Sequence, residues 1–446
     1  MRETNRFFDP TGDFAGEVPR RVYARIDRIE NSRLLFEAVD AEWFDGEMEG
    51  RHDFEFWMNA SNRAPISVIE IEALIEIDAR GRLVAIRMDV DGKPKPFGGF
   101  RDSPWVVLQL SGAGENARLY PNLFTEGRSV EIRDIDEIAS EMRRNLDRSF
   151  SIARHVVDEA TMRRRLASLE SRTIEWVVVY DVGQGATNGL CDDRGMPLAY
   201  ADLGGGVLAN KGTFDPRMRG LCLTHSPPVI LSHWDWDHWS SGMRFPRSQH
   251  MQWIVPLQGL GAVHSAFAAV LAGNGCLNVW PSSLDRLGVG QIMIRKCTGN
   301  GRNHSGLAVE VHGPDGQSPI LLPGDARYNV IPGALGRDWQ SVVVPHHGAD
   351  MRNSQVPGPS RSALSRAAYS CGAGNNYSHP RDITERNHHV AGWPHSACGG
   401  RASVDLRTDR LRTNQKLGHI GLGWDSPASA VRLPCRGGCA LDFEVA

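Results

Sequence analysis

The segment SHWDWDHWSSG places four side chains that can bind divalent metal ions within six positions. His233, Asp235 and Asp237 alternate along the segment, so they point the same way if the backbone is extended, and His238 comes next. Imidazole nitrogens and carboxylate oxygens are the ligands that divalent ions take in hydrolytic sites. Neighbouring carboxylates repel each other strongly unless a cation lies between them. The spacing therefore predicts a metal centre, with enough ligands for two ions, rather than an exposed acidic loop.

Further candidate residues each follow a short apolar run later in the chain. Asp325 follows the run ILLPG, His346 and His347 follow VVVP, and His379 lies in the stretch NNYSHP. Strand ends can hold side chains from distant parts of the sequence in one fixed arrangement. We expect these residues to meet the first segment at one edge of a sheet.

The elements that must position these residues are short strands with polar groups at their carboxyl ends. From residue 174 onward such strands recur, for example in IEWVVVYDVGQG, PPVILSHW, LAVEVHG and SVVVPHHG. Residues 20–110 show the alternation of strands, whereas residues 134–172 contain no Gly or Pro and have apolar residues at helical spacing. The sequence predicts an α/β protein with a strand-rich N-terminal module at 1–133, a helical linker at 134–172 and a catalytic domain at 173–446.

Residues 174 to about 380 resemble the metallo-β-lactamase fold superfamily, and within it the ComEC-like branch, the nuclease-like domain of a competence protein. The joint occurrence of HxDxDH with a later GD and HHG is a specific signal. The matching stretches, in the order of the family, are DVGQG (181–185), ADLGGG (201–206), SHWDWDH (232–238), NHSGLAVEV (303–311), PGDA (323–326), PHHG (345–348) and GNNYSHP (374–380). The resemblance implies an αββα sandwich, in which two sheets face each other, helices lie outside and the metal site lies at the edge.

The resemblance also implies which residues bind the ions. His233 and Asp235 would bind a first ion, and Asp237 and His238 a second. Asp325 would bridge both ions. Asp237 is expected to belong to the catalytic residues as well. We expect two divalent ions, Zn(II) or Mn(II).

The roles of the remaining polar residues follow from the same resemblance. His346 is the expected last ligand of the first ion, and His379 is the alternative for that position. His347 and His379 are expected to contact the substrate phosphate or to protonate the leaving oxygen. Asp181 and Asp202 would orient ligands or loops without touching an ion.

Two features depart from the widespread lactamase pattern. Asp235 stands where that pattern has histidine, and the stretch NHSG, with His304, stands where it has a further histidine ligand. The resulting site is richer in oxygen, which favours Mn(II) or Mg(II) beside Zn(II). Three tryptophans also surround the motif. We expect Trp234, Trp236 and Trp239 to pack beneath the site rather than to stack on bases.

Composition limits the class of protein. The net charge of −3 argues against binding nucleic acid mainly through a broad cationic surface. The longest apolar stretch, residues 261–273, is too short to span a bilayer and predicts a buried helix, so we expect a cytoplasmic protein with no membrane contact. The eight cysteines suggest reduced thiols. An alternative for some of them is a structural zinc site formed by His395, Cys398, Cys435 and Cys439.

These features predict a metal-dependent hydrolase, specifically a phosphodiesterase or nuclease acting on DNA or RNA through a water activated by two ions. One alternative is hydrolysis of a small phosphodiester, an ester, a lactam or a nucleotide signal, because a fold alone does not define its substrate. Another is a metal-binding effector component without catalytic activity, in a multi-protein system such as anti-phage defence. In that setting the N-terminal module would dock a protein partner.

Overall fold

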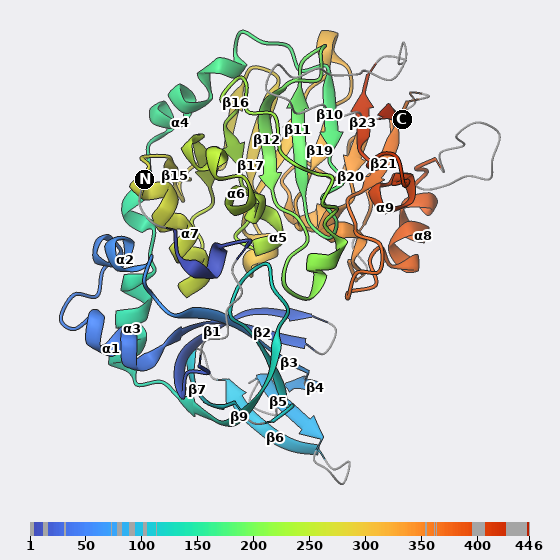
Figure 1. Ribbon diagram of the computed structural model, residues 1–446. Helices are drawn as coiled ribbons and strands as arrows, with labels where there is room; N and C mark the ends of the chain where they lie inside the picture. Colours follow the sequence, from blue (N-terminus) through green and yellow to red (C-terminus); the bar gives the residue numbers. More distant parts are fainter. Residues whose placement is uncertain are drawn as a thin grey trace. The chain divides into compact units, whose positions relative to one another are not determined.

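The computed structural model describes most of the chain (Figure 1). The described residues are 4–11, 17–30, 33–72, 74–77, 83–88, 94–100, 105–112, 114–352, 355–360, 362, 364–394, 406–424 and 444–445. The alternative zinc site at His395, Cys398, Cys435 and Cys439 lies outside these residues. The chain forms two compact units. The barrel unit comprises Met1–Arg154 and Gly259–Gly273, and the two-sheet unit comprises His155–Gln258 and Asn274–Ala446.

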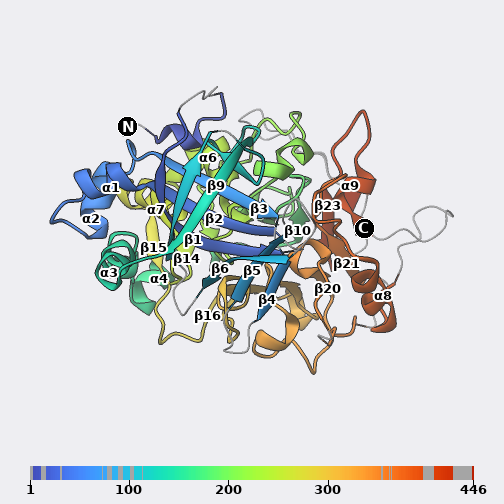
Figure 2. The same cartoon turned by 90° about the horizontal axis from the view of Figure 1, so that it is seen from below.

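The barrel unit is built around a closed barrel of antiparallel strands. Figure 2 shows some of these strands, among them β1, β2, β3 and β9, from below. Its strands, in spatial order, are β1 (Arg21–Glu30), β2 (Arg33–Asp40), β3 (Ile66–Glu72), β8 (Ala117–Tyr120), β9 (Arg128–Glu137) and β7 (Trp105–Ser111), and β7 pairs with β1. Alternate apolar residues such as Val22, Phe36, Ile69 and Leu108 form its buried core. A separate antiparallel sheet contains β4 (Leu74–Ile77), β5 (Leu83–Met88) and β6 (Pro94–Phe100).

Short helices accompany the barrel strands. They are α1 (Ala41–Glu47), α2 (Phe54–Ala60) and α3 (Ser140–Ser149). The alternation in the stretch FEFWMNA, which is typical of a strand, is misleading because this stretch forms α2. Asp53 caps that helix by accepting a hydrogen bond from the backbone N–H of Phe56 at 2.9 Å. Phe54 and Trp57, three positions apart, are buried on one face.

The segment 134–172, predicted as a helical linker, is only partly helical. Its first residues continue β9 as far as Glu137. The helices α3 and α4 (Glu159–Leu166) follow, and the division between the two units falls between them, after Arg154.

The apolar stretch 261–273 forms the buried helix α7 (Ala262–Gly273), as predicted. The carboxylate of Glu37 accepts hydrogen bonds from the backbone N–H groups of Gly261 at 3.0 Å and His264 at 2.8 Å. An acceptor at this end is favourable because the first N–H groups of a helix have no partner within it. Among the described residues, no helix combines the length and apolar character needed to cross a membrane.

The two-sheet unit contains the candidate site residues. One sheet has the order β15 (Leu277–Val279), β14 (Trp253–Val255), β13 (Val229–Ile230), β12 (Pro197–Leu203), β11 (Thr187–Cys191), β10 (Trp176–Val179), β23 (Ile420–Gly423) and β24 (Glu444–Val445). The other has the order β16 (Arg286–Val289), β17 (Ile292–Lys296), β18 (Leu307–Val311), β19 (Ile320–Leu322), β20 (Ser341–Val343), β21 (Arg366–Tyr369) and β22 (Leu406–Arg407). Both sheets mix parallel and antiparallel neighbours.

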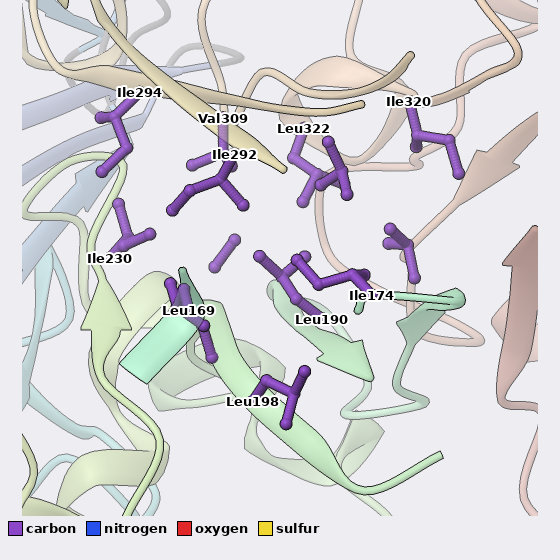
Figure 3. Packing of buried hydrophobic residues seen from close by; sticks show 14 of the residues in the cluster. Leu169, Ile174, Leu190, Leu198, Ile230, Ile292, Ile294, Val309, Ile320 and Leu322 are labelled. Atoms are coloured by element: carbon purple, nitrogen blue, oxygen red, sulfur yellow. The ribbon is translucent and has the colours of Figure 1, made fainter. Parts of the chain in front are cut away.

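The two sheets share one hydrophobic core. Leu190 and Ile230 of the first sheet lie across from Ile292, Val309 and Leu322 of the second (Figure 3). Burying each of these side chains contributes about 1.5–3 kcal/mol. Short helices complete the unit. They are α5 (Trp236–Trp239), α6 (Ser241–Arg244), α8 (Asp382–Val390) and α9 (Thr408–Leu411). The predicted mixed α/β class is confirmed.

Candidate metal centre

The segment that carries the first four candidate ligands leaves β13 and turns into α5. His233 and Asp235 precede the helix, and Asp235 is its N-terminal flanking residue in extended conformation. Asp237 and His238 lie within α5, so the segment is not extended throughout as the alternation suggested. All four side chains are buried. The rings of His233 and His238 lie against each other, with centroids 4.1 Å apart, although one residue precedes the helix and the other lies within it.

The tryptophans of this segment form its packing layer. Trp234, Trp236 and Trp239 are buried, which confirms the prediction that they pack rather than offer indoles to bases. The indole N–H of Trp234 donates to the carbonyl of Pro256 at 3.0 Å. Burying such large side chains makes the segment rigid.

Asp325 follows β19 in a tight turn that requires glycine. Gly324 has a φ of 57°, and a Cβ atom there would lie 2.5 Å from the Cβ and Oγ atoms of Ser232. This close approach brings Asp325 beside the segment that begins at His233. The glycine of the GD motif is thus explained by both backbone conformation and space.

His346 and His347 follow β20 in a turn with unusual backbone angles. Both residues have positive φ values, 51° and 54°, in the left-handed region that residues other than glycine adopt at a cost. The N–H of His346 donates to the carbonyl of Gly324 at 3.2 Å. His347 Nδ1 donates to the carbonyl of Ser370 at 2.9 Å, which leaves the lone pair of a neutral ring on Nε2.

The carboxylate of Asp325 lies between two groups of side chains. Asp325 Oδ2 is 3.5 Å from His233 Nε2 and 3.5 Å from His346 Nε2. Asp325 Oδ1 is 3.0 Å from His238 Nε2 and 3.9 Å from His347 Nε2. Each oxygen of this carboxylate therefore faces a different pair of imidazoles.

A second aspartate joins each group. Asp235 Oδ2 lies 3.3 Å from His233 Nε2, and Asp237 Oδ2 lies 3.4 Å from His347 Nε2. We call His233, Asp235, His346 and Asp325 Oδ2 the first ligand group. The second ligand group is Asp237, His238, His347 and Asp325 Oδ1. Ligand atoms of His233, His238 and Asp325 lie within 4.8 Å of one another, as do those of Asp237, His238 and His347.

Several of these buried atoms lack a hydrogen bond. They are Nε2 of His233, His238 and His347 and both carboxylate oxygens of Asp325, with no hydrogen-bond partner among the described residues. Asp325 Oδ1 and His238 Nε2 are only 3.0 Å apart but do not form a hydrogen bond. Buried polar atoms without partners are costly. Imidazole nitrogens and carboxylate oxygens that converge in this way fit divalent ions.

The carboxylates and imidazoles of the cluster shift one another's pKa values. Burial by itself would raise the pKa of Asp325, but the imidazoles of His346, His238 and His233 lower it well below its usual value. Burial would likewise lower the pKa of His238, but the carboxylates of Asp325 and Asp202 raise it well above its usual value. Protons and metal ions therefore compete for the same atoms.

Asp202 lies outside the two ligand groups and contacts a member of the second one. Its carboxylate accepts hydrogen bonds from the N–H of Ser232 at 2.6 Å and from His238 Nδ1 at 2.9 Å. Asp181 instead secures the segment after α9. It accepts hydrogen bonds from the guanidinium of Arg412 and from the N–H of Gly418.

His379 lies beside the first ligand group. Its ring meets the ring of His346 edge to face, with centroids 5.6 Å apart. His379 Nδ1 is 3.3 Å from the side-chain nitrogen of Gln184. His346 Nε2 lies 3.5 Å from Asp325 Oδ2, so the geometry favours His346 as the late ligand.

Sequence reasoning missed Arg302. Its Nη1 atom lies 3.4 Å from Asp235 Oδ1, and the side chain is 8% exposed. Arg302 is close in sequence to His304, but only its position relative to Asp235 reveals its relation to the site. His304 itself belongs to neither ligand group, and burial, Arg327 and His346 lower its pKa.

The structure thus brings together all six expected metal ligands and His347, with His379 as their neighbour. They come from turns that follow β13, β19, β20 and β21, strands that belong to both sheets. In comparisons with known proteins, no family model matches this chain, and no significantly similar curated protein was found.

Proposed function

We propose that this protein is a metal-dependent hydrolase that cleaves phosphodiester bonds, with DNA or RNA as the substrate. The observation that carries the proposal is the position of Asp325, whose two carboxylate oxygens face two separate groups of imidazoles. A carboxylate that is shared in this way is typical of sites that hold two ions side by side.

We further propose that the two-sheet unit is an αββα sandwich of the metallo-β-lactamase superfamily, of the ComEC-like branch. Two sheets with a common core support this assignment. The order of the motifs along the chain supports it as well, because the turns that carry them follow strands of both sheets and meet at one place.

The donor set defines which ions fit. The first ligand group offers two imidazoles and two carboxylates, and the second offers the same. Mixed nitrogen and oxygen ligands suit Zn(II) or Mn(II). A bound pair of such ions would supply Lewis acidity and an activated water.

The role of His347 changes from the one predicted. Its Nε2 faces Asp237, and its Nδ1 donates to a backbone carbonyl, an arrangement common among metal-binding histidines. We therefore assign His347 to the second ligand group rather than to the substrate phosphate. Asp237, predicted as both ligand and catalytic residue, belongs to the same group.

Other residues are placed to handle the substrate. The guanidinium of Arg302 lies beside Asp235 and can attract a phosphate oxygen, since guanidinium and phosphate form charge-assisted hydrogen bonds. His379 lies next to His346, where its ring can donate a hydrogen bond to the leaving oxygen. Hydrolysis of a phosphodiester needs both functions, because charge develops on the phosphate and on the oxygen that departs.

A cleavage assay tests the proposal. The purified protein is freed of ions with a chelator, reloaded with Mn(II) or Zn(II), and given labelled single- and double-stranded DNA and RNA and a small phosphodiester. We expect cleavage that requires the ion and falls at least ~100-fold in Asp325→Asn. The matched control is Asp158→Asn, because Asp158 caps α4 and asparagine caps helices equally well.

The outcomes separate the alternatives. Cleavage of polynucleotides supports a nuclease, and cleavage of the small compound alone points to a small phosphodiester as substrate. Tight binding of ions with no turnover on any phosphodiester would overturn the proposal and identify a metal-binding effector component.

A further inference from the structure

We infer that Gln184 is a positioning residue that fixes the tautomer of His379, so that the neutral ring offers its Nε2–H as a hydrogen-bond donor instead of binding an ion. The inference rests on the proposed function for its chemical meaning. Gln184 belongs to the DVGQG stretch after β10, and both side chains are buried, at 1% and 4% exposure. The side-chain nitrogen of Gln184 lies 3.3 Å from His379 Nδ1.

Gln184 is held firmly in its turn. Its backbone N–H donates to Thr213 Oγ1 at 2.8 Å. A Cβ atom on Gly183 would lie 2.5 Å from the same oxygen, and one on Gly372 would lie 2.7 Å from the nitrogen of Gln184. The close packing on these sides leaves the backbone of Gln184 little freedom to shift.

His379 is held equally firmly. Its backbone N–H donates to Asn375 Oδ1 at 2.9 Å, and Asn375 Nδ2 donates back to its carbonyl at 2.7 Å. The ring of Tyr377 lies against its ring, with centroids 5.6 Å apart. The ring therefore has a defined position between Gln184 and His346.

The partner of Nδ1 distinguishes this histidine from two of the ligands. His238 Nδ1 donates to the carboxylate of Asp202, and His347 Nδ1 donates to the carbonyl of Ser370. In both rings Nε2 therefore keeps the lone pair that an ion requires. In His379, Nδ1 meets an amide N–H, which can only donate. Nδ1 is then the acceptor, and the proton of the neutral ring lies on Nε2.

This tautomer suits a hydrogen bond to the leaving oxygen. A water oxygen forms the new bond to phosphorus, and the bond from phosphorus to the leaving oxygen breaks with its electron pair on that oxygen. The leaving oxygen accepts a hydrogen bond from the Nε2–H of neutral His379, which stabilises the developing negative charge. The proton that the attacking water gives up to solvent balances the one that the leaving oxygen takes from solvent, so His379 keeps its own proton throughout. His379 is thus a catalytic residue, and Gln184 acts through it.

The tautomer can be read directly in the metal-free protein. Protein labelled with 15N at histidine is studied by NMR, and the signals of His379 are identified by their absence in His379→Gln. We expect Nε2 to carry the proton and Nδ1 to lack it, and we expect Gln184→Glu to place a proton on Nδ1. A wild-type ring with its proton on Nδ1 would overturn the inference, whether or not the protein has any hydrolytic activity.

A leaving-group comparison tests the functional consequence. A phosphodiester with a poor leaving group, such as a nucleoside alcohol, needs a hydrogen bond to the departing oxygen, whereas p-nitrophenolate spreads its charge over the ring and depends on that bond much less. We expect Gln184→Met to lower kcat on the first about 100-fold and on the second less than about fivefold. The control is Gln340→Met, which removes another buried glutamine whose amide donates to the Gly423 carbonyl.

The two experiments fail in different ways. Equal losses on both substrates would overturn the assignment of Gln184, since a structural defect slows both. Absence of turnover in the wild type on every phosphodiester would refute the proposed function, and the NMR result would still decide the tautomer.

Discussion

His238 Nδ1 donates a hydrogen bond to Asp202 at 2.9 Å, and this contact directs His238 Nε2 to Asp325 Oδ1, 3.0 Å away. The orientation of the His238 ring thus depends on Asp202, a residue outside both proposed ligand groups. Asp202 also accepts a hydrogen bond from the N–H of Ser232, so it links the imidazole to the backbone just before His233.

Replacing Asp202 is therefore expected to weaken ion binding while leaving every ligand in place. In Asp202→Asn the amide nitrogen can donate to His238 Nδ1. The proton of the neutral ring then lies on Nε2, the atom whose lone pair an ion requires. We expect a loss of about 10- to 100-fold in affinity for the second ion, measured by calorimetric titration. An affinity equal to that of the wild type would show that Asp202 does not orient His238.

Gly324 offers a test of the turn that places Asp325. Gly324→Ala introduces a Cβ atom 2.5 Å from Ser232 in addition to an unfavourable positive φ. The control is Gly275→Ala, where φ is also positive, 68°, but no atom lies within 4 Å of the new Cβ.

The control isolates the contribution of close packing. Both variants should lose about 1–2 kcal/mol from the backbone conformation, and Gly324→Ala should lose at least ~1 kcal/mol more. Urea unfolding measures the difference. Equal stability of the two variants would mean that Ser232 moves aside easily and that the turn is not tightly specified.

Arg302 is expected to act on the substrate more than on the ions. Arg302→Met removes the charge near Asp235 but keeps much of the side-chain volume. We expect KM for a phosphodiester to rise about tenfold, which corresponds to about 1.4 kcal/mol, with a smaller change in kcat. Steady-state kinetics provides the measurement, and Arg286→Met, on the exposed start of β16, is the control.

A different result would reassign Arg302. If ion affinity changes in Arg302→Met while KM stays the same, the guanidinium serves to position Asp235 instead of attracting phosphate.

The metal-free protein should become less stable as pH rises toward 9. Burial and His238 lower the pKa of His233, but Asp235 and Asp325 outweigh them and raise it from 6.5 to about 9. A pKa that is higher in the folded than in the unfolded state stabilises the fold fully below pH 6.5, and this contribution disappears as pH rises through about 9.

Ions reverse this trend because they need the unprotonated imidazoles. The increase in melting temperature on adding Mn(II) or Zn(II) should therefore grow between pH 6.5 and about 9. Thermal unfolding at stepped pH, with and without ions, measures both effects. A stabilisation by ions that shrinks over this range would contradict the coupling of His233 to its carboxylates.

The sequence predicted the cluster of histidines and aspartates because these residues follow strands, and strand ends are places that a fold can bring together. It could not predict a role for Arg302, which lies in no motif, or for Gln184, which lies in the DVGQG stretch but gains its role only from His379, the neighbour that the fold supplies. The stretch at Phe54–Ala60 was misread because its alternation suits a strand, whereas the cap at Asp53 favours a helix. Likewise, only tertiary contacts show that Gly259–Gly273 belongs to the barrel unit.

The central claim is that Asp325 bridges two ions, and the stoichiometry of ion binding tests it most directly. Chelator-treated protein is titrated with Mn(II) or Zn(II), and bound ions per chain are counted by elemental analysis after removal of free ions. We predict two ions per wild-type chain and at most one tightly bound ion in Asp325→Asn. A wild-type chain that binds no ion, or an Asp325→Asn chain that binds two as tightly as the wild type, would contradict the account.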